Sequence, residues 1–157
     1  MKTLRIYVDT SVIGGCFDTK YQLWSNALMR DFDLGLLKPV VSDLSGFEIA
    51  GAPPHVQGVY ARLATVAEQV ATTAEVEDLL AHYETKAIIG PRYRNDMQYI
   101  ALATVYGVDV LVSWNFKHML RFDKVRLFNA ANLEMGYGEL RIHSPREVTT
   151  YDPEADD

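Results

Sequence analysis

The sequence predicts an α/β sandwich with a mainly parallel central sheet. Short apolar runs of strand length alternate along the chain with longer segments of helical periodicity. The 157 residues, 48% of them hydrophobic, suit one domain with a substantial core and are too few for two. We therefore expect one domain over residues 1–150, followed by an acidic, disordered tail at 151–157.

The first predicted strand covers residues 4–8, which carry apolar side chains at alternate positions before Asp9 ends the run. Thr10 and Ser11 follow, and their short hydroxyl side chains are typical of helix caps. The chain therefore passes from a strand into a helix at Asp9. In an α/β fold such a junction lies at the carboxyl edge of the sheet, where sites form.

A second junction of this kind follows. Residues 21–37 have apolar side chains near helical spacing, and the Lys-Pro pair at 38–39 ends that helix before a strand at 40–41. Ser42 then begins a short helix that carries Glu48 and is closed by a glycine and a proline pair.

The second half repeats the alternation. The helix over 95–107 is polar only in its first turn, which holds Asp96, so it should be buried. The expected elements in chain order are a helix at 56–67, a short strand within 68–73, an amphipathic helix at 74–87, the helix at 95–107, a strand at 108–115 and a last strand at 124–129.

Three acids stand at or near these junctions. Asp9 ends an apolar strand, where a carboxylate is costly unless it is paired, metal-bound or used as a helix cap. Glu48 by itself has the pattern of an ordinary helical carboxylate, and Asp96 is either a first-turn acid that stabilises the helix dipole or part of a polar crevice. Gathered at one sheet edge, their hard oxygen ligands suit Mg²⁺ or Mn²⁺ better than zinc.

At this point the sequence resembles a PIN domain and, more narrowly, the VapC-like ribonuclease toxins of bacterial toxin-antitoxin pairs. Three segments carry the resemblance, at residues 7–15, 40–50 and 95–120, and it extends from about residue 4 to residue 130. It implies a PIN-like three-layer α/β/α sandwich. The four acidic positions of the family's pattern fall here on Asp9, Glu48, Asp96 and Asn115.

The resemblance implies a Mg²⁺- or Mn²⁺-dependent endoribonuclease that hydrolyses RNA phosphodiester bonds. Asp9 and Asp96 would hold the metal, with Asn115 as an auxiliary ligand, while Glu48 would position or deprotonate the attacking water. Asn115 departs from the family's pattern, because it keeps an oxygen but lacks the fourth negative charge. An antitoxin protein is the implied partner, and a homodimer is also expected.

Further residues near these acids are candidates for binding RNA. They are Thr10, Ser11, Ser113, Lys117 and His118. For the three hydroxyl residues the alternative is capping or turn hydrogen bonding, and for the last two it is a solvated lysine and a partly buried, hydrogen-bonded histidine. Trp114 and Phe116 flank the proposed site, where stacking on bases and packing in the core both stay open.

The net charge of −6 argues at first against nucleic-acid binding. Four of the 21 acids lie in the tail, however, which leaves 17 acids against 15 basic residues in the rest of the chain. Seven basic residues between positions 86 and 126 could form a basic rim around the acids. No run has the length of a membrane span, and the single Cys16 allows no internal disulfide, so a cytoplasmic protein is expected.

Three other functions are alternatives to the nuclease. A PIN-like binding module, its metal site weakened by Asn115, would act only through a protein partner. A phospho-receiver domain fits poorly, because it needs paired acids after its first strand, where Asp9 is followed by Thr10 and Ser11. A haloacid-dehalogenase phosphatase needs a second Asp two residues after Asp9, and Ser11 occupies that position.

Overall fold

The structure, a computed structural model, describes residues 2–155. Five strands form one sheet in the order β3-β2-β1-β4-β5, and every neighbouring pair is parallel. The strands are β1 (Arg5–Val8), β2 (Lys38–Ser42), β3 (Glu68–Val70), β4 (Val110–Val112) and β5 (Ile142–His143). The parallel sheet expected from the sequence is confirmed.

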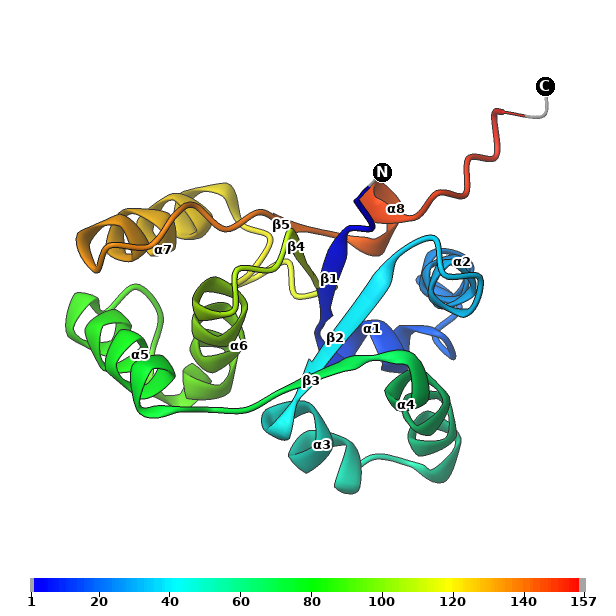
Figure 1. The fold of residues 1–157 in the computed structure, drawn as a ribbon, viewed down its shortest axis with the longest axis horizontal. Helices are drawn as coiled ribbons and strands as arrows, with labels where there is room; N and C mark the ends of the chain where they lie inside the picture. The colour runs from blue at the N-terminus through cyan, green and yellow to red at the C-terminus, as the bar shows by residue number, and fades with distance from the viewer. Residues whose placement is uncertain (1, 156–157) are drawn as a thin grey trace.

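Helices cover both faces of the sheet, which gives three layers (Figure 1). One face carries α1 (Thr10–Gly15), α2 (Gln22–Asp33), α3 (Asp43–Ala50) and α4 (Pro54–Val66). The other carries α5 (Ala74–Lys86), α6 (Arg94–Val105) and α7 (Phe122–Glu134), with the short 3₁₀ turn η1 (Pro91–Tyr93) before α6. The last helix, α8 (Pro145–Val148), packs against α2.

Each face of the sheet has its own hydrophobic core, because side chains alternate along a strand. In β1, Ile6 and Val8 enter the core beneath α1, α2 and α4, whereas Tyr7 enters the core beneath α5, α6 and α7. All three side chains are fully buried. The central strand is therefore fixed from both sides, which also fixes the position of the residue that follows it.

The predicted last strand at 124–129 is wrong, since these residues belong to α7. Val125, Phe128 and Ala131 contact the core at intervals of three residues, which is helical spacing, while Leu127 is 49% exposed. The last strand is instead β5, whose two residues follow a loop after α7. A short apolar run fits either period, and here packing against α5 decides for the helix.

Two other boundaries differ from the expectation. Helix α2 ends at Asp33 rather than near residue 37, and Gly35 adopts a φ of +73° in the turn that follows. The tail boundary at residue 150 stays a prediction, because residues 156 and 157 lie outside the described part of the chain. Within residues 2–155, no helix is long and apolar enough to span a membrane.

The strand order places β1 beside β4, although two other strands, β2 and β3, and the helices around them separate β1 from β4 along the chain. The chain leaves β1 toward one face of the sheet and reaches β4 from the other (Figure 1), which is the arrangement in which α/β folds place their sites at the carboxyl ends of two neighbouring strands. Asp9 follows β1 and Ser113 follows β4 at this point. The topology therefore places the first of the predicted site residues at the switch point of the sheet.

Candidate active site

Asp9 is buried at the carboxyl end of β1, with 6% of its surface exposed. It occupies the cap position of α1, but its side chain makes no cap hydrogen bond, so the capping interpretation is wrong. Its Oδ2 instead accepts hydrogen bonds from the hydroxyls of Ser11 and Ser113, each at 2.7 Å. Burial, together with the negative charges of Glu48 and Asp96, raises the pKa of Asp9 to about 6, and the hydrogen bonds from the two serines oppose this rise.

Glu48 reaches the same region from α3. The strand-to-helix junction that positions it begins with Ser42, which forms a capping box with Ser45, as a helix-starting serine is expected to do. Glu48 Oε1 accepts hydrogen bonds from Thr10 Oγ1 at 3.2 Å and from the hydroxyl of Tyr99. The half-buried carboxylate is thus held from two different helices, α1 and α6.

Tyr99 is the site residue that the sequence reasoning missed. It lies one turn after Asp96 in α6 and is almost fully buried. Burial, and then the nearby negative charge of Asp9, raise its pKa far above the usual tyrosine value, so the hydroxyl keeps its proton and can donate to Glu48. The sequence signal that could have indicated this role is a tyrosine within an otherwise apolar helix, because a buried hydroxyl needs a hydrogen-bond partner.

Asp96 lies half-buried in the first turn of α6 and is held by the loop after β4. Its Oδ2 accepts from Asn115 Nδ2 at 3.1 Å and lies 2.8 Å from His118 Nδ1. Asn115 Oδ1 accepts the backbone N–H of His118 at 3.0 Å, so both polar atoms of the amide are engaged within the protein. Because that backbone group can only donate, the orientation of the amide is well determined.

A cleft of about 560 Å³ connects these groups and is lined by Asp9, Glu48, Asp96 and Asn115, together with Thr10 and Ser11. In each of the three carboxylates, one oxygen accepts two hydrogen bonds and the other accepts none from residues 2–155. No lysine or arginine in this part of the chain forms an ion pair with any of the three. The cleft therefore concentrates negative charge, and the only basic side chain that the described residues place against it is His118, beside Asp96.

The three carboxylates share a cleft but do not form a closed coordination shell. Across the described residues, no three His, Cys, Asp or Glu side chains lie close enough together to enclose a metal ion. The donor set is nevertheless of the hard oxygen type that Mg²⁺ and Mn²⁺ prefer, with one free oxygen on each acid. The chemistry of the residues fits such an ion, but the three carboxylates would have to move closer together to coordinate it.

The predicted RNA-binding residues divide into two groups. Ser11 and Ser113 are engaged with Asp9, and Ser113 Oγ also accepts the backbone N–H of Asn115 at 2.9 Å. His118 is buried and lies within hydrogen-bond distance of Asp96, which agrees with the alternative of a buried, hydrogen-bonded histidine. Lys117 alone is exposed, with its Nζ 5.3 Å from the ring centre of Tyr93. A role of these residues in binding RNA stays a prediction.

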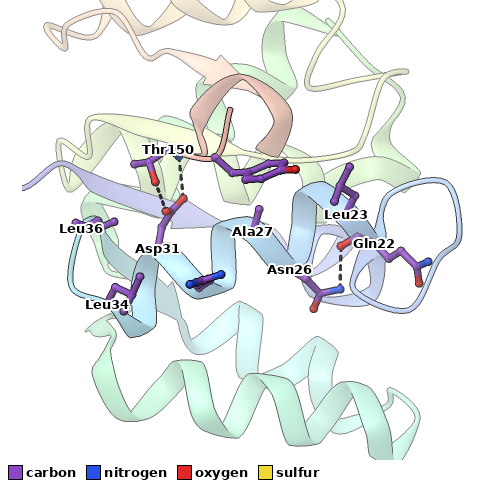
Figure 2. A pocket seen from close by; sticks show the side chains of 10 residues that line it. Gln22, Leu23, Asn26, Ala27, Asp31, Leu34, Leu36 and Thr150 are labelled. Atoms are coloured by element: carbon purple, nitrogen blue, oxygen red, sulfur yellow. Dashed lines mark hydrogen bonds between the residues drawn. The ribbon is translucent and has the colours of Figure 1, made fainter. Parts of the chain in front are cut away.

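A larger hollow of about 680 Å³ lies elsewhere, between α2 and the segment after α8 (Figure 2). Its buried acid, Asp31, accepts hydrogen bonds from Thr149 Oγ1 at 2.7 Å and from the backbone N–H and the hydroxyl of Thr150. Both carboxylate oxygens are thus used to attach the C-terminal segment to α2. We attribute a structural role to this hollow and consider the smaller, acid-lined cleft the better candidate for chemistry.

No protein-family model and no curated protein matches the sequence. Several solved structures match the fold. A chain of VapBC2 from Rickettsia felis, bound to a DNA fragment from its promoter, is 12% identical with a TM-score of 0.56, over 90% of this chain and 98% of that one. A chain of VapBC-1 from nontypeable Haemophilus influenzae is 15% identical with a TM-score of 0.58, over 91% and 99%.

A chain of DNA-bound VapBC from Salmonella typhimurium is 14% identical with a TM-score of 0.56, over 91% of this chain and 99% of that one. These likenesses cover nearly the whole of each protein and agree with the parallel five-stranded sheet. The chain therefore has the PIN-like three-layer α/β/α fold that the sequence resemblance implied. At such low identity the likeness concerns the fold, and the activity has to be argued from the site.

Proposed function

We propose that the chain is a Mg²⁺- or Mn²⁺-dependent endoribonuclease that acts as the toxin of a toxin-antitoxin pair. One observation carries the proposal. Asp9, Glu48 and Asp96 come from three separate elements into one cleft at the switch point of a PIN-like fold, and no lysine or arginine of the described residues pairs with any of them. Holding three acids together costs stability, and a bound cation is the usual compensation for that cost.

Asp9 and Asp96 are the acids that would hold the metal, with Asn115 as the auxiliary ligand. A bound divalent ion would lower the pKa of a coordinated water and offset charge on the phosphate oxygens. Ser11 and Ser113 fix Asp9 through Oδ2 and leave its Oδ1 free, while Asn115 and His118 fix Asp96 in the same way. The protein would thus supply oriented, partly dehydrated carboxylates.

Glu48 is the group suited to orient and deprotonate the attacking water. Tyr99 and Thr10 both donate to its Oε1, so the second carboxylate oxygen is free and its direction is set by the first. A carboxylate held in this way can accept a proton from a water that lies within hydrogen-bond reach. Thr10 and Lys117 are then the side chains proposed to contact the RNA backbone.

The test is cleavage of mixed RNA by the purified chain with Mn²⁺ or Mg²⁺. We expect Asp9→Asn and Asp96→Asn to abolish cleavage, whereas Asp33→Asn, a change in an exposed acid paired with Arg62 on the surface, should leave it unchanged. The measurement is the appearance of shorter fragments on a gel. Cleavage that survives in both site variants would sink the assignment of the site.

A non-catalytic binding module with the same fold is the second candidate. The spacing of the carboxylates favours it, because no three of them enclose a metal ion within residues 2–155. Thermal unfolding with and without Mn²⁺ separates the two functions. A nuclease site should be stabilised by Mn²⁺ in the unmodified chain and not in Asp96→Asn, whereas the module should show no such difference.

We further propose a protein partner that covers the cleft, because the structural neighbours are VapBC structures. The protein encoded beside this gene is the first to test. Added to the nuclease assay, it should bind the chain and stop RNA cleavage, and full activity in the presence of a bound partner would contradict this role. A homodimer stays a prediction, to be checked by light scattering.

A further inference from the structure

Three aromatic rings form a surface beside the acidic cleft. Trp114, which also lines the cleft, is stacked on Tyr21 with ring centres 4.3 Å apart and an angle of 21° between the ring planes. Phe116 lies 6.4 Å from Tyr21 and 6.2 Å from Trp114, at angles of 29° and 38°. We call Tyr21, Trp114 and Phe116 the aromatic platform. Its rings come from the start of α2 and from the loop after β4.

The platform is fixed relative to the acids. Trp114 Nε1 donates to Ser25 Oγ at 2.8 Å, and its backbone N–H donates to Ser11 Oγ at 3.0 Å. Ser11 in turn donates to Asp9, so one hydroxyl joins the backbone of Trp114 to the proposed metal ligand. A Cβ at Gly15 would lie 2.7 Å from Trp114 Nε1, which shows that the indole rests directly on bare backbone. Such close support leaves the ring little freedom to move.

The outer end of the platform is open to water and has basic neighbours. Phe116 is 55% exposed, although a phenylalanine gains most free energy from burial. Lys20 Nζ lies 5.4 Å from the ring centre of Tyr21, and the exposed Lys117 follows Phe116 in the chain. Exposed rings next to lysines are the combination with which proteins bind single-stranded nucleic acid, because the rings stack on bases and the cations meet phosphates.

We propose that the aromatic platform binds an unpaired nucleobase of an RNA strand whose backbone passes through the acidic cleft. The inference rests on the proposed nuclease function and adds a base-binding subsite to it. Tyr21 and Trp114 are stacked on each other, the exposed Phe116 beside them is the ring on which a planar base can stack, and Trp114 belongs to both the platform and the cleft. Phe116 also borders an apolar groove with Phe122 and Leu120, so the competing occupant is an apolar side chain of a protein partner.

Phe116→Ala is the informative change, because the side chain is exposed and its loss leaves both cores intact. Phe122→Ala is the matched control, since Phe122 is 76% exposed and lies outside the platform. Binding of a labelled oligouridine is measured in EDTA and at low salt, where no cleavage occurs. We expect Phe116→Ala to bind about tenfold more weakly than the unmodified chain, and Phe122→Ala to bind equally well.

An abasic ribose-phosphate strand of the same length separates stacking from charge. The unmodified chain and Phe116→Ala should bind this abasic strand equally well. Lys20→Ala should bind both the abasic strand and oligouridine more weakly, and the salt dependence of its binding should fall by about one counterion. In the Mn²⁺ cleavage assay Phe116→Ala should raise KM about tenfold at unchanged kcat. Circular dichroism confirms that each variant is folded.

Equal binding of oligouridine by Phe116→Ala and Phe122→Ala overturns the base subsite. If both variants then fail to bind a protein partner that the unmodified chain binds, the groove that Phe116 shares with Phe122 is a protein-docking surface instead. Weakened binding in Phe116→Ala without any metal-dependent cleavage supports the subsite and contradicts the nuclease. No RNA binding by the unmodified chain in EDTA or in Mn²⁺ contradicts both proposals.

Discussion

Asp9→Asn should make the protein more stable when divalent metal is absent. The unmodified carboxylate is buried near two other acids, and its charge has no basic partner among the described residues. Ser11 and Ser113 both donate to the same oxygen, Oδ2, so an asparagine can accept both hydrogen bonds through its single carbonyl oxygen. The amide N–H₂ then takes the place of Oδ1, which makes no hydrogen bond with residues 2–155. The substitution therefore removes a charge without leaving either serine unpaired.

The magnitude follows from the pKa of Asp9, which burial raises from 3.8 to about 6. A raised carboxyl pKa means that the folded chain holds the proton more tightly than the unfolded chain does. The free energy of unfolding therefore falls as pH rises from about 4 to about 6 and then stays level. A rise of the Asp9 pKa from 3.8 to about 6 corresponds to about 3 kcal/mol. Asp9→Asn avoids this loss, so at pH 7.5 its Tm should be roughly 6–12 °C higher, with no difference below about pH 4.

Urea unfolding in EDTA, at pH values from about 4 to about 8, measures the difference. Asp31→Asn is the matched control, because Asp31 is equally buried but accepts hydrogen bonds on both oxygens. In Asp31→Asn the amide N–H₂ would replace an oxygen that accepts a hydrogen bond, so at least one bond to the C-terminal segment would be lost or rearranged. The variant should therefore be less stable than the unmodified chain at every pH. If Asp9→Asn is also destabilised between pH 6 and 8, the cleft does not hold an uncompensated charge and the basis for proposing a cation there is lost.

Three more substitutions test how the acids and the indole of Trp114 are held. Tyr99→Phe removes a donor to Glu48, so RNA cleavage should fall roughly tenfold or more in kcat with little change in KM, and unchanged kinetics would contradict a positioning role. Asn115→Asp loses a donor to Asp96 and adds a charge; it should lower stability in EDTA and increase the stabilisation by Mn²⁺, as measured by thermal unfolding. Gly15→Ala forces a methyl group against the indole and should cost about 1–3 kcal/mol in urea unfolding, with a change in tryptophan fluorescence; normal stability and fluorescence would show that the indole is not held there.

The sequence predicted the parts of the site that depend on local pattern. A buried strand that ends in an acid, followed by a helix, fixes the place of Asp9 at the carboxyl edge of the sheet, and the same reasoning holds for Ser42 at the start of α3. The partners could not be predicted, because they depend on contacts between distant segments. Tyr99 donates across 51 positions to Glu48, and Ser113 donates across 104 positions to Asp9.

The error at α7 has a related cause. Residues 124–129 carry apolar side chains that fit both a period of two and a helical period, and only the rest of the helix decides between them. Asn132, eight residues after Lys124, is fully buried and makes hydrogen bonds with Tyr83 and Thr104 on the neighbouring helices. A polar residue with such partners fixes the helix rotation, but nothing in its own surroundings in the sequence reveals those partners.

Asn115 illustrates how one substitution changes both the stability of the cleft and its demand for metal. A fourth carboxylate at this position would face Asp96, whereas the amide donates to Asp96 at 3.1 Å and accepts the backbone N–H of His118. The amide therefore lowers the electrostatic cost of the metal-free fold and also removes a charge that would attract a cation. Stability in EDTA and affinity for Mn²⁺ should consequently change in opposite directions at this position. A variant series at residue 115 in which both rise together would show that the amide does not lower the electrostatic cost of the metal-free fold.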